Sequence, residues 1–178
     1  QLAELSGPVS EWLKRQSPHL LTDCASVFDL LFDATIQAIG THGGDAVGRP
    51  AKGNRWFERA LNHPAGRLAD AIFSDPKAHS LTSQSGIPDD WKKRLQKVLA
   101  MEGASGACAI AIVASRLTWL FEIDPVWVRI IVLPIVDGAG SASEAFWSGY
   151  MSGHYVPSHA LYRELKNSFV NLASQSAQ

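Results

Sequence analysis

The chain has 178 residues and a mass of 19.3 kDa, which is the size of one ordinary domain. Apolar residues make up 46% of the sequence, so disordered, collagen-like and low-complexity polymers are excluded. Sixteen basic and 17 acidic residues leave a net charge of −1, and no strong overall field favours nucleic acid or an anionic membrane. We expect residues 1–178 to form a single folded domain. Because the chain starts with Gln1 rather than Met and ends in a polar tail, we also expect it to be a fragment of a longer protein.

Apolar residues recur at helical spacing along the chain, whereas the alternating, β-branched runs typical of strands are missing. The pattern predicts a short first helix over residues 8–16, stopped by the Ser-Pro pair at 17–18, and a second helix over 20–39. The second helix is apolar on two flanks, which is typical of a helix with neighbours on both sides. The Gly-rich segment 40–53 is predicted to be a surface loop.

Turn and cap residues mark the joints in the next stretch. Two short helices are predicted to meet at Asn62 and His63, with His63 as the N-cap of the helix that Pro64 begins. The polar segment 75–86 is predicted to be a second surface loop. The Ile-Pro pair at 87–88 then opens a helix whose charged residues are expected on a solvated face.

The second half of the chain contains the most apolar predicted helices. Residues 105–122 are predicted to form one central helix, and residues 126–133, begun by the N-cap Asp124, to form the most buried element. Ser141 and Glu144 match a capping box, and Ser158 is expected to cap the last helix. About eight helices with short connections favour an all-α fold, either an antiparallel helical-hairpin stack similar to HEAT or TPR repeats or an irregular multi-helix array.

Cys24 and Cys108 both lie in apolar segments and belong to no Cys-x-x-Cys motif. Two cysteines placed in this way predict reduced thiols in the core of a cytoplasmic protein rather than a disulfide framework. The longest apolar stretch, 106–123, is interrupted by Arg116 and Glu122 and is too polar for a membrane span of about 20 residues. We therefore expect no membrane association.

Motifs for catalysis and cofactor binding do not stand out. The sequence lacks the Gly-x-Ser-x-Gly of a nucleophile elbow, clustered zinc ligands and the Gly-Lys-Ser/Thr of a phosphate loop. We expect no catalytic residue, cofactor or metal. One alternative stays open: Asp29 and Asp33 lie one helical turn apart, and paired carboxylates would suit a small metal-dependent helical hydrolase.

Two arginines lie within otherwise apolar helices. We expect Arg67 and Arg116 each to pair with an acid such as Asp70, Glu122 or Asp124. An arginine held by packing is also a typical interaction anchor. Arg67 and Arg116 are therefore candidate interaction residues.

The six Trp residues exceed what a core of this size needs, and Trp is enriched at interface hot spots. Trp119 and Trp147 flank the apolar stripes of their helices and are candidates for a contact surface. His63 completes the candidate interaction residues, although its role as an N-cap is the simpler interpretation.

Basic residues gather around the first predicted loop. The candidate phosphate contacts are Arg49, Lys52, Arg55 and Arg59. Two acids in the same segment dilute the patch, so we expect a local contact at most. A nucleic-acid-binding helical array is nevertheless a second alternative function, and its binding would weaken as the salt concentration rises.

Several phrases between residues 56 and 150 are specific enough to compare with known families. They are LNHPAGRLAD at 61–70, GIP at 86–88, SRLTWLF at 115–121, DPVW at 124–127, LPIVD at 133–137 and AFWSG at 145–149. Together they resemble the helical C-terminal domain of unknown function found in large bacterial sirtuin-like proteins that defend against phage. The first of these phrases is the most specific.

The resemblance implies that NAD consumption belongs to a separate sirtuin-like module, and this chain carries no dinucleotide-binding fingerprint. We therefore expect a non-catalytic interaction or regulatory domain of a bacterial anti-phage protein. Its expected partner is a protein trigger derived from phage, or neighbouring domains of the same polypeptide. A homo-oligomer is a further expectation.

Overall fold

A computed structural model describes residues 2–40, 55–138, 140–153 and 156–176. Every regular element within these residues is helical, which confirms the all-α prediction. The α-helices are α1 (Leu2–Asp23), α2 (Ala25–Gly40), α3 (Trp56–Asn62), α4 (Pro64–Phe73), α5 (Asp89–Leu99), α6 (Gly103–Ser115), α7 (Leu117–Ile123), α8 (Pro125–Trp127), α9 (Ser141–Ser152) and α10 (His159–Ser176). Three shorter turns are η2 (Pro76–Ser80), η3 (Val128–Val132) and η4 (Leu133–Ile135). The predicted loop 40–53 lies outside the described residues except for Gly40, the last residue of α2.

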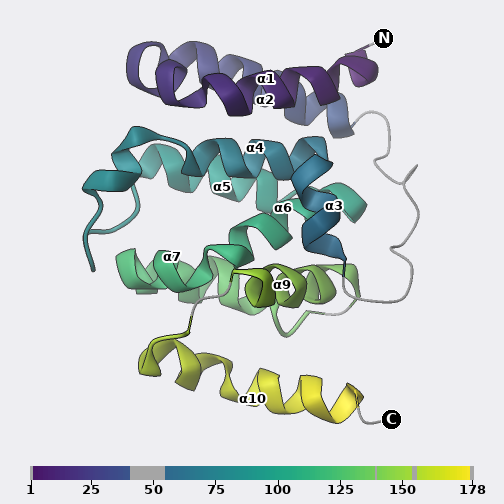
Figure 1. Ribbon diagram of the computed structural model, residues 1–178, viewed down its shortest axis with the longest axis vertical. Helices are drawn as coiled ribbons and strands as arrows, with labels where there is room; N and C mark the ends of the chain where they lie inside the picture. Colours follow the sequence, from purple (N-terminus) through teal and green to yellow (C-terminus); the bar gives the residue numbers. More distant parts are fainter. Residues whose placement is uncertain (1, 41–54, 139, 154–155, 177–178) are drawn as a thin grey trace.

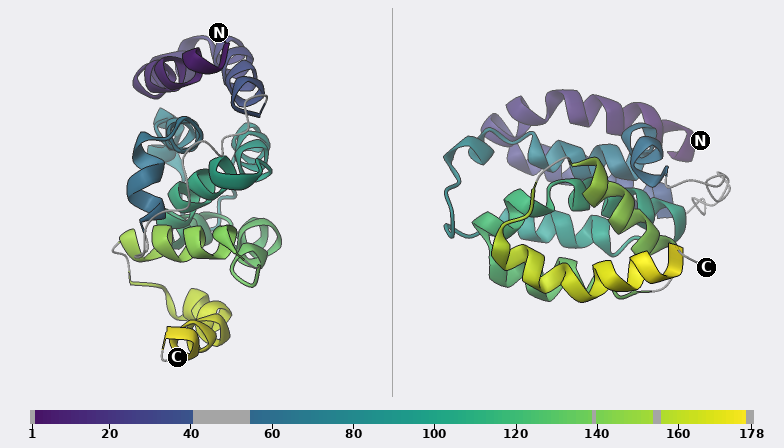
Figure 2. Two further views of the ribbon diagram at one scale, coloured as in Figure 1. Left: turned by 90° about the vertical axis from the view of Figure 1, so that its right-hand side faces the viewer. Right: turned by 60° about the horizontal axis from the view of Figure 1, so that its bottom comes forward.

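The helices are stacked in layers along the longest axis of the molecule (Figures 1 and 2). The hairpin of α1 and α2 forms one end, and α10 forms the other. Between them, α4 and α5 lie next to the hairpin, and α7 and α9 lie nearer to α10. Helix α6 runs through the middle, and its residues from Ser105 to Ser115 are all buried. One continuous hydrophobic core follows from this arrangement.

The predicted boundaries of the first two helices are wrong. Helix α1 continues through both Pro8 and Pro18. Pro18 has no backbone N–H to donate to the carbonyl of Lys14, but the Ser17 hydroxyl donates to that oxygen at 2.9 Å instead. The helix therefore continues to Asp23, and the chain reverses at Cys24 inside the predicted helix 20–39.

The predicted central helix 105–122 is also two helices. Its axis bends by 65° between α6 and α7, with Arg116 at the junction. Among the described residues, no single helix combines the length and apolarity of a bilayer crossing, and α6 and α7 reach them only when taken together across this bend.

Burial differs from the sequence-based prediction at two further places. The segment 126–133 is not the most buried element, because Val126 and Ile130 are 62% and 66% exposed. The spacing of apolar residues shows that a helix is apolar, but it does not show which face of the helix a neighbouring element covers. Cys24 is exposed at the hairpin turn rather than in the core, whereas Cys108 is buried. Burial raises the pKa of the Cys108 thiol to about 11, which the nearby Arg59 opposes.

The caps are partly as predicted. Asp124 caps the turn that follows it, and the Ser158 hydroxyl accepts a hydrogen bond from Leu161 N at 3.2 Å. The capping box at the start of α9 does not form, because Gly140 is the N-cap there. The Glu144 carboxylate accepts a hydrogen bond from Trp56 Nε1 at 3.3 Å instead. This contact joins α9 to α3.

Candidate functional site

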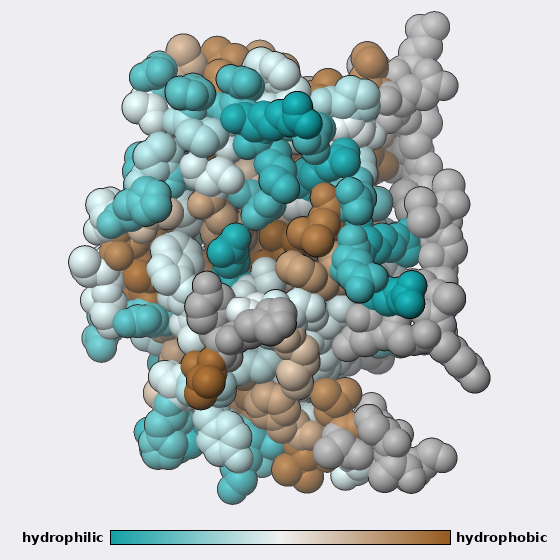
Figure 3. All heavy atoms as spheres, in the orientation of Figure 1, coloured by the Kyte–Doolittle hydropathy of each residue, from teal (hydrophilic) through white to brown (hydrophobic). Residues whose placement is uncertain are grey.

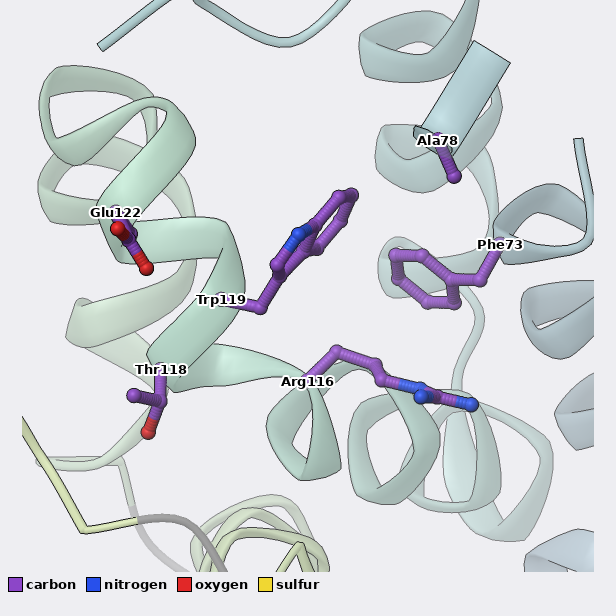
Figure 4. A pocket seen from close by; sticks show the side chains of 6 residues that line it. All are labelled: Phe73, Ala78, Arg116, Thr118, Trp119 and Glu122. Atoms are coloured by element: carbon purple, nitrogen blue, oxygen red, sulfur yellow. The ribbon is translucent and has the colours of Figure 1, made fainter. Parts of the chain in front are cut away.

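A half-open cavity of about 270 Å³ lies between α4, η2 and α7 (Figure 4). We call it the Trp119 pocket. Its lining residues are Phe73, Ala78, Arg116, Thr118, Trp119 and Glu122.

Aromatic packing fixes the apolar wall of the Trp119 pocket. The Trp119 ring lies 6.4 Å from the ring of Phe73, nearly perpendicular to it, and 6.2 Å from the ring of Trp91. Edge-to-face contacts of this kind add to the stability that burial gives. Trp91 is itself fully buried and donates from Nε1 to Asp75 Oδ2 at 2.9 Å. The wall is therefore formed before any ligand binds.

Two opposite charges flank Trp119 at the rim. The guanidinium of Arg116 is half exposed and reaches Asp70 only at 3.8 Å, while Asp70 is paired more closely with Lys14, at 3.0 Å. The carboxylate of Glu122 is exposed and forms no hydrogen bond or ion pair with the described residues. Figure 4 shows Arg116 and Glu122 on different sides of the Trp119 indole. Both charges are available to a ligand.

The 65° bend between α6 and α7 brings the rim residues together. The last residues of the second predicted loop fix α7 in place, because Gln84 N donates to Glu122 O at 2.9 Å and Gly86 N donates to Ile123 O at 3.0 Å. Gly86 has a φ of +80°, which favours glycine there. The pocket therefore depends on residues far apart in the sequence.

Asp124 ties these segments to one another. Its carboxylate accepts hydrogen bonds from Ile87 N at 3.1 Å and Trp127 N at 3.0 Å, and it pairs with Lys92 at 2.9 Å. Burial opposes ionisation of this carboxyl, but the Lys92 ammonium and the two amides outweigh it and hold the Asp124 pKa below its ordinary value. Asp124 is thus a structural residue behind the pocket.

The predicted interaction residues separate into two groups. Arg116 and Trp119 both line the Trp119 pocket. Trp147 is only 4% exposed, because Phe169 of α10 covers it at 4.8 Å between ring centroids. Trp147 therefore belongs to the core between α9 and α10 rather than to a contact surface.

His63 and Arg67 serve the joint between α3, α4 and α1. The predicted N-cap role of His63 is confirmed, since its Nδ1 accepts a hydrogen bond from Ala65 N at 3.2 Å. Arg67 pairs with Glu11 of α1 at 3.0 Å, not with the acids predicted from its own neighbourhood. The pKa of His63 is lowered to about 4, first by burial and then by the charges of Arg59 and Arg67.

We expect His63 to make stability depend on pH. Its folded pKa lies below the ordinary 6.5, so its contribution is complete above pH 6.5 and is lost progressively as the pH falls toward about 4. His63→Asn keeps a side-chain acceptor at the N-cap without titrating. Between about pH 7 and pH 4.5, urea unfolding should show the wild type losing about 1 kcal/mol more than the variant, a value reduced for partial exposure.

The control for this experiment is His79→Asn, at an exposed histidine near the end of η2. That variant should lose as much stability in acid as the wild type. Equal losses in the wild type and in His63→Asn would show that another group causes the acid sensitivity.

The candidate phosphate contacts are only partly described. Arg49 and Lys52 lie outside the described residues, and Arg55 is exposed just before α3. The Arg59 guanidinium lies over the Trp56 ring, 5.1 Å from its centroid. Stacking of this kind gives Arg59 a structural contact.

Asp29 and Asp33 are partly exposed, and each is paired with a basic residue of α5. Asp29 receives a two-pronged ion pair from Arg94, with Nε at 2.7 Å, and the Arg94 side chain is only 4% exposed. Asp33 pairs with Lys97 at 2.6 Å. The charged face of α5 is therefore partly an interface with α2. Within the described part of the chain, no group of three or more His, Cys, Asp or Glu residues is placed to hold a metal ion.

Four pocket residues were not predicted from the sequence. Glu122 lies three residues after Trp119, so helical spacing around that Trp was a usable signal for it. Thr118 is adjacent to Trp119 in the sequence, and helical spacing gave no signal for it. Phe73 matched a core stripe, and Ala78 lay in a predicted loop. Neither of these two carried a sequence signal for a pocket.

We compared the chain with protein-family models, with curated proteins and with solved structures, and none of them matches it.

Proposed function

We propose that this chain is a helical interaction module and that the Trp119 pocket receives an apolar side chain of a protein partner. The observation that carries the proposal is the preformed aromatic wall of Phe73, Trp91 and Trp119, open on one side to solvent. A preformed wall lowers the entropic cost of binding. Buried Trp and Arg anchors dominate the energy of many protein interfaces.

The two charged residues at the rim of the Trp119 pocket determine which charges a partner segment should carry. A segment that fills the pocket places its neighbouring residues near Arg116 on one side and Glu122 on the other (Figure 4). Opposite charges across an interface favour association, and like charges oppose it. The partner is therefore a segment with a large apolar residue flanked by an acidic residue on one side and a basic residue on the other.

The remaining features support a binding role over the alternatives. The carboxylates that a hydrolase would use, Asp29 and Asp33, are taken by Arg94 and Lys97. For the nucleic-acid alternative, Arg59 is engaged with Trp56. Both observations give these residues a role in holding the fold.

The biological setting that we propose follows from the resemblance in the sequence. The module would be a cytoplasmic regulatory domain of a bacterial anti-phage protein, in which a separate module consumes NAD. The pocket would then bind a phage-derived protein trigger or a neighbouring domain of the same protein. The comparisons give no independent support to this setting.

A peptide selection tests the proposal directly. Immobilised 178-residue protein is presented with a random peptide library, and the dissociation constants of the selected peptides are measured by fluorescence polarisation. We expect these peptides to share an apolar residue between an acid and a base. Arg116→Glu should weaken their binding about ten-fold or more, because it places like charges together.

The matched controls separate a loss of charge complementarity from a loss of folding. The double variant Arg116→Glu/Glu122→Arg should bind a peptide whose two charges are exchanged. Arg163→Glu, at an exposed position of α10, should bind the original peptide like the wild type. Selected peptides that bind Arg116→Glu as tightly as the wild type would rule out the Trp119 pocket as the contact site.

A further inference from the structure

The outer side of the α1–α2 hairpin is an apolar surface that no described element covers. The buried residues of α1 and α2 face the rest of the molecule. On the outer sides of these helices, helical spacing groups Leu5 with Trp12, and Val27 with Leu30 and Ala34, and all five side chains are exposed. These two groups form the apolar strip. Leu30 is 71% exposed, Leu5 53% and Trp12 48%. Figure 3 shows hydrophobic residues along the upper edge of the molecule, where Figure 1 places this hairpin. We call it the hairpin face.

The charged residues of the hairpin face lie toward its edges. Arg15 is at the rim, and its guanidinium is already bonded to Glu11 at 2.9 Å. The exposed Asp23 is the last residue of α1, and the exposed His19 lies between Asp23 and Trp12 on the same stripe. The rim on α2 is formed by the uncharged residues Ser26 and Gln37. Contiguous exposed apolar surfaces of this kind mark association sites rather than ordinary solvated helices. The centre of the face, around Trp12 and Leu30, offers apolar contacts rather than ion pairs.

We propose that the hairpin face binds the same face of a second copy of this chain in a two-fold symmetric dimer. An apolar face whose charged residues lie toward its edges complements itself, and an isologous contact closes the assembly. The opposite end of the stack does not complement it, because the outer stripe of α10 contains the polar residues Arg163, Asn167 and Ser174 beside the apolar Val170. A head-to-tail chain of copies would place the apolar strip on this polar stripe.

The dimensions of the hairpin face are sufficient for a stable dimer. The 22 residues of α1 span about 33 Å and the 16 residues of α2 about 24 Å, and each helix is about 10 Å wide. The contact would bury about 570 Å² on each copy, or about 1,100 Å² in total, which exceeds the roughly 1,000 Å² that a specific interface needs. Trp12, near the middle of the strip, would be its main anchor.

The dimer would also affect binding at the Trp119 pocket. None of the residues that line this pocket belongs to α1 or α2, so a dimer would present two such pockets. A partner with two binding segments would then gain affinity through effective concentration.

Sedimentation equilibrium of the full chain, with a reductant because Cys24 is exposed, tests the dimer. At about 10 to 100 μM we expect twice the mass of the 19.3 kDa chain. Leu30→Glu should weaken dimerisation at least about ten-fold. It should not lower the thermal unfolding midpoint of the monomer, because Leu30 is largely exposed.

The control is Val170→Glu, at a 58% exposed residue of the α10 outer stripe, which should remain as dimeric as the wild type. Three results would each overturn the proposal. They are a wild type that is monomeric at about 100 μM, a dimer that Leu30→Glu leaves intact, and an assembly that Val170→Glu disrupts.

Discussion

Replacing Gly149 by Ala is expected to destabilise the protein by about 3 kcal/mol or more. Helix α9 crosses α6 so closely at this point that a Cβ on residue 149 would lie 1.9 Å from the Ala111 carbonyl oxygen. Backbone atoms cannot move aside as a flexible side chain can, so the two helices must separate and leave voids in the core. Chemical unfolding should show the loss, and the thermal midpoint should fall by about 6–12 °C.

Gly40→Ala is the matched control, because it adds the same methyl group to the last residue of α2 with nothing within 4 Å of the new atom. Glycine-to-alanine propensity counts for little at the end of a helix, so this variant should stay within about 0.5 kcal/mol of the wild type. Only the substitution at Gly149 should therefore cause a large loss of stability. Similar effects of both would show that α6 and α9 do not cross at backbone contact.

The second large effect is expected from Asp124→Ala, which should cost about 3 kcal/mol. The substitution leaves the amides of Ile87 and Trp127 without their acceptor and Lys92 without its partner. Unsatisfied buried donors cost more than the net value of the bonds themselves. Urea unfolding at about pH 7 measures the loss, and hydrogen exchange should show faster opening near residues 84–87.

Asp124→Asn separates charge from hydrogen bonding. It keeps one carbonyl acceptor but not the ion pair with Lys92, so its stability should lie between those of the wild type and Asp124→Ala. Because the folded pKa of Asp124 is lowered, its charge contributes fully above the ordinary carboxyl pKa and is lost as the pH falls through the folded value. The wild type and Asp124→Asn should thus converge in acid. A constant difference across the acid range would contradict this role.

Local interactions explain why some features could be predicted from the sequence. The caps at His63, Asp124 and Ser158 depend on residues within three positions of each, so short patterns identify them. The helix breaks at Cys24 and Arg116 have no Gly or Pro to mark them. Their positions are set by packing against distant helices, which periodicity does not report.

The candidate site also combines residues that could be predicted from the sequence with residues that could not. Arg116 and Trp119 stand out as a charged and an aromatic residue beside an apolar stripe, and both line the pocket. Phe73 and Ala78 reach it from α4 and η2, more than 30 residues earlier in the chain. Trp147 has a similar sequence context to Trp119, but α10 covers it. Which aromatic residue remains open is decided by tertiary structure.

The most direct test is a nuclear magnetic resonance titration of the ¹⁵N-labelled full chain with a selected peptide. The indole N–H of Trp119 should show the largest shift among the six Trp signals, accompanied by the amides of residues 116–122. The shifts should not occur in Arg116→Glu under the same conditions. Shifts centred on another part of the chain, with the Trp119 signal unchanged, would contradict a binding site at the Trp119 pocket.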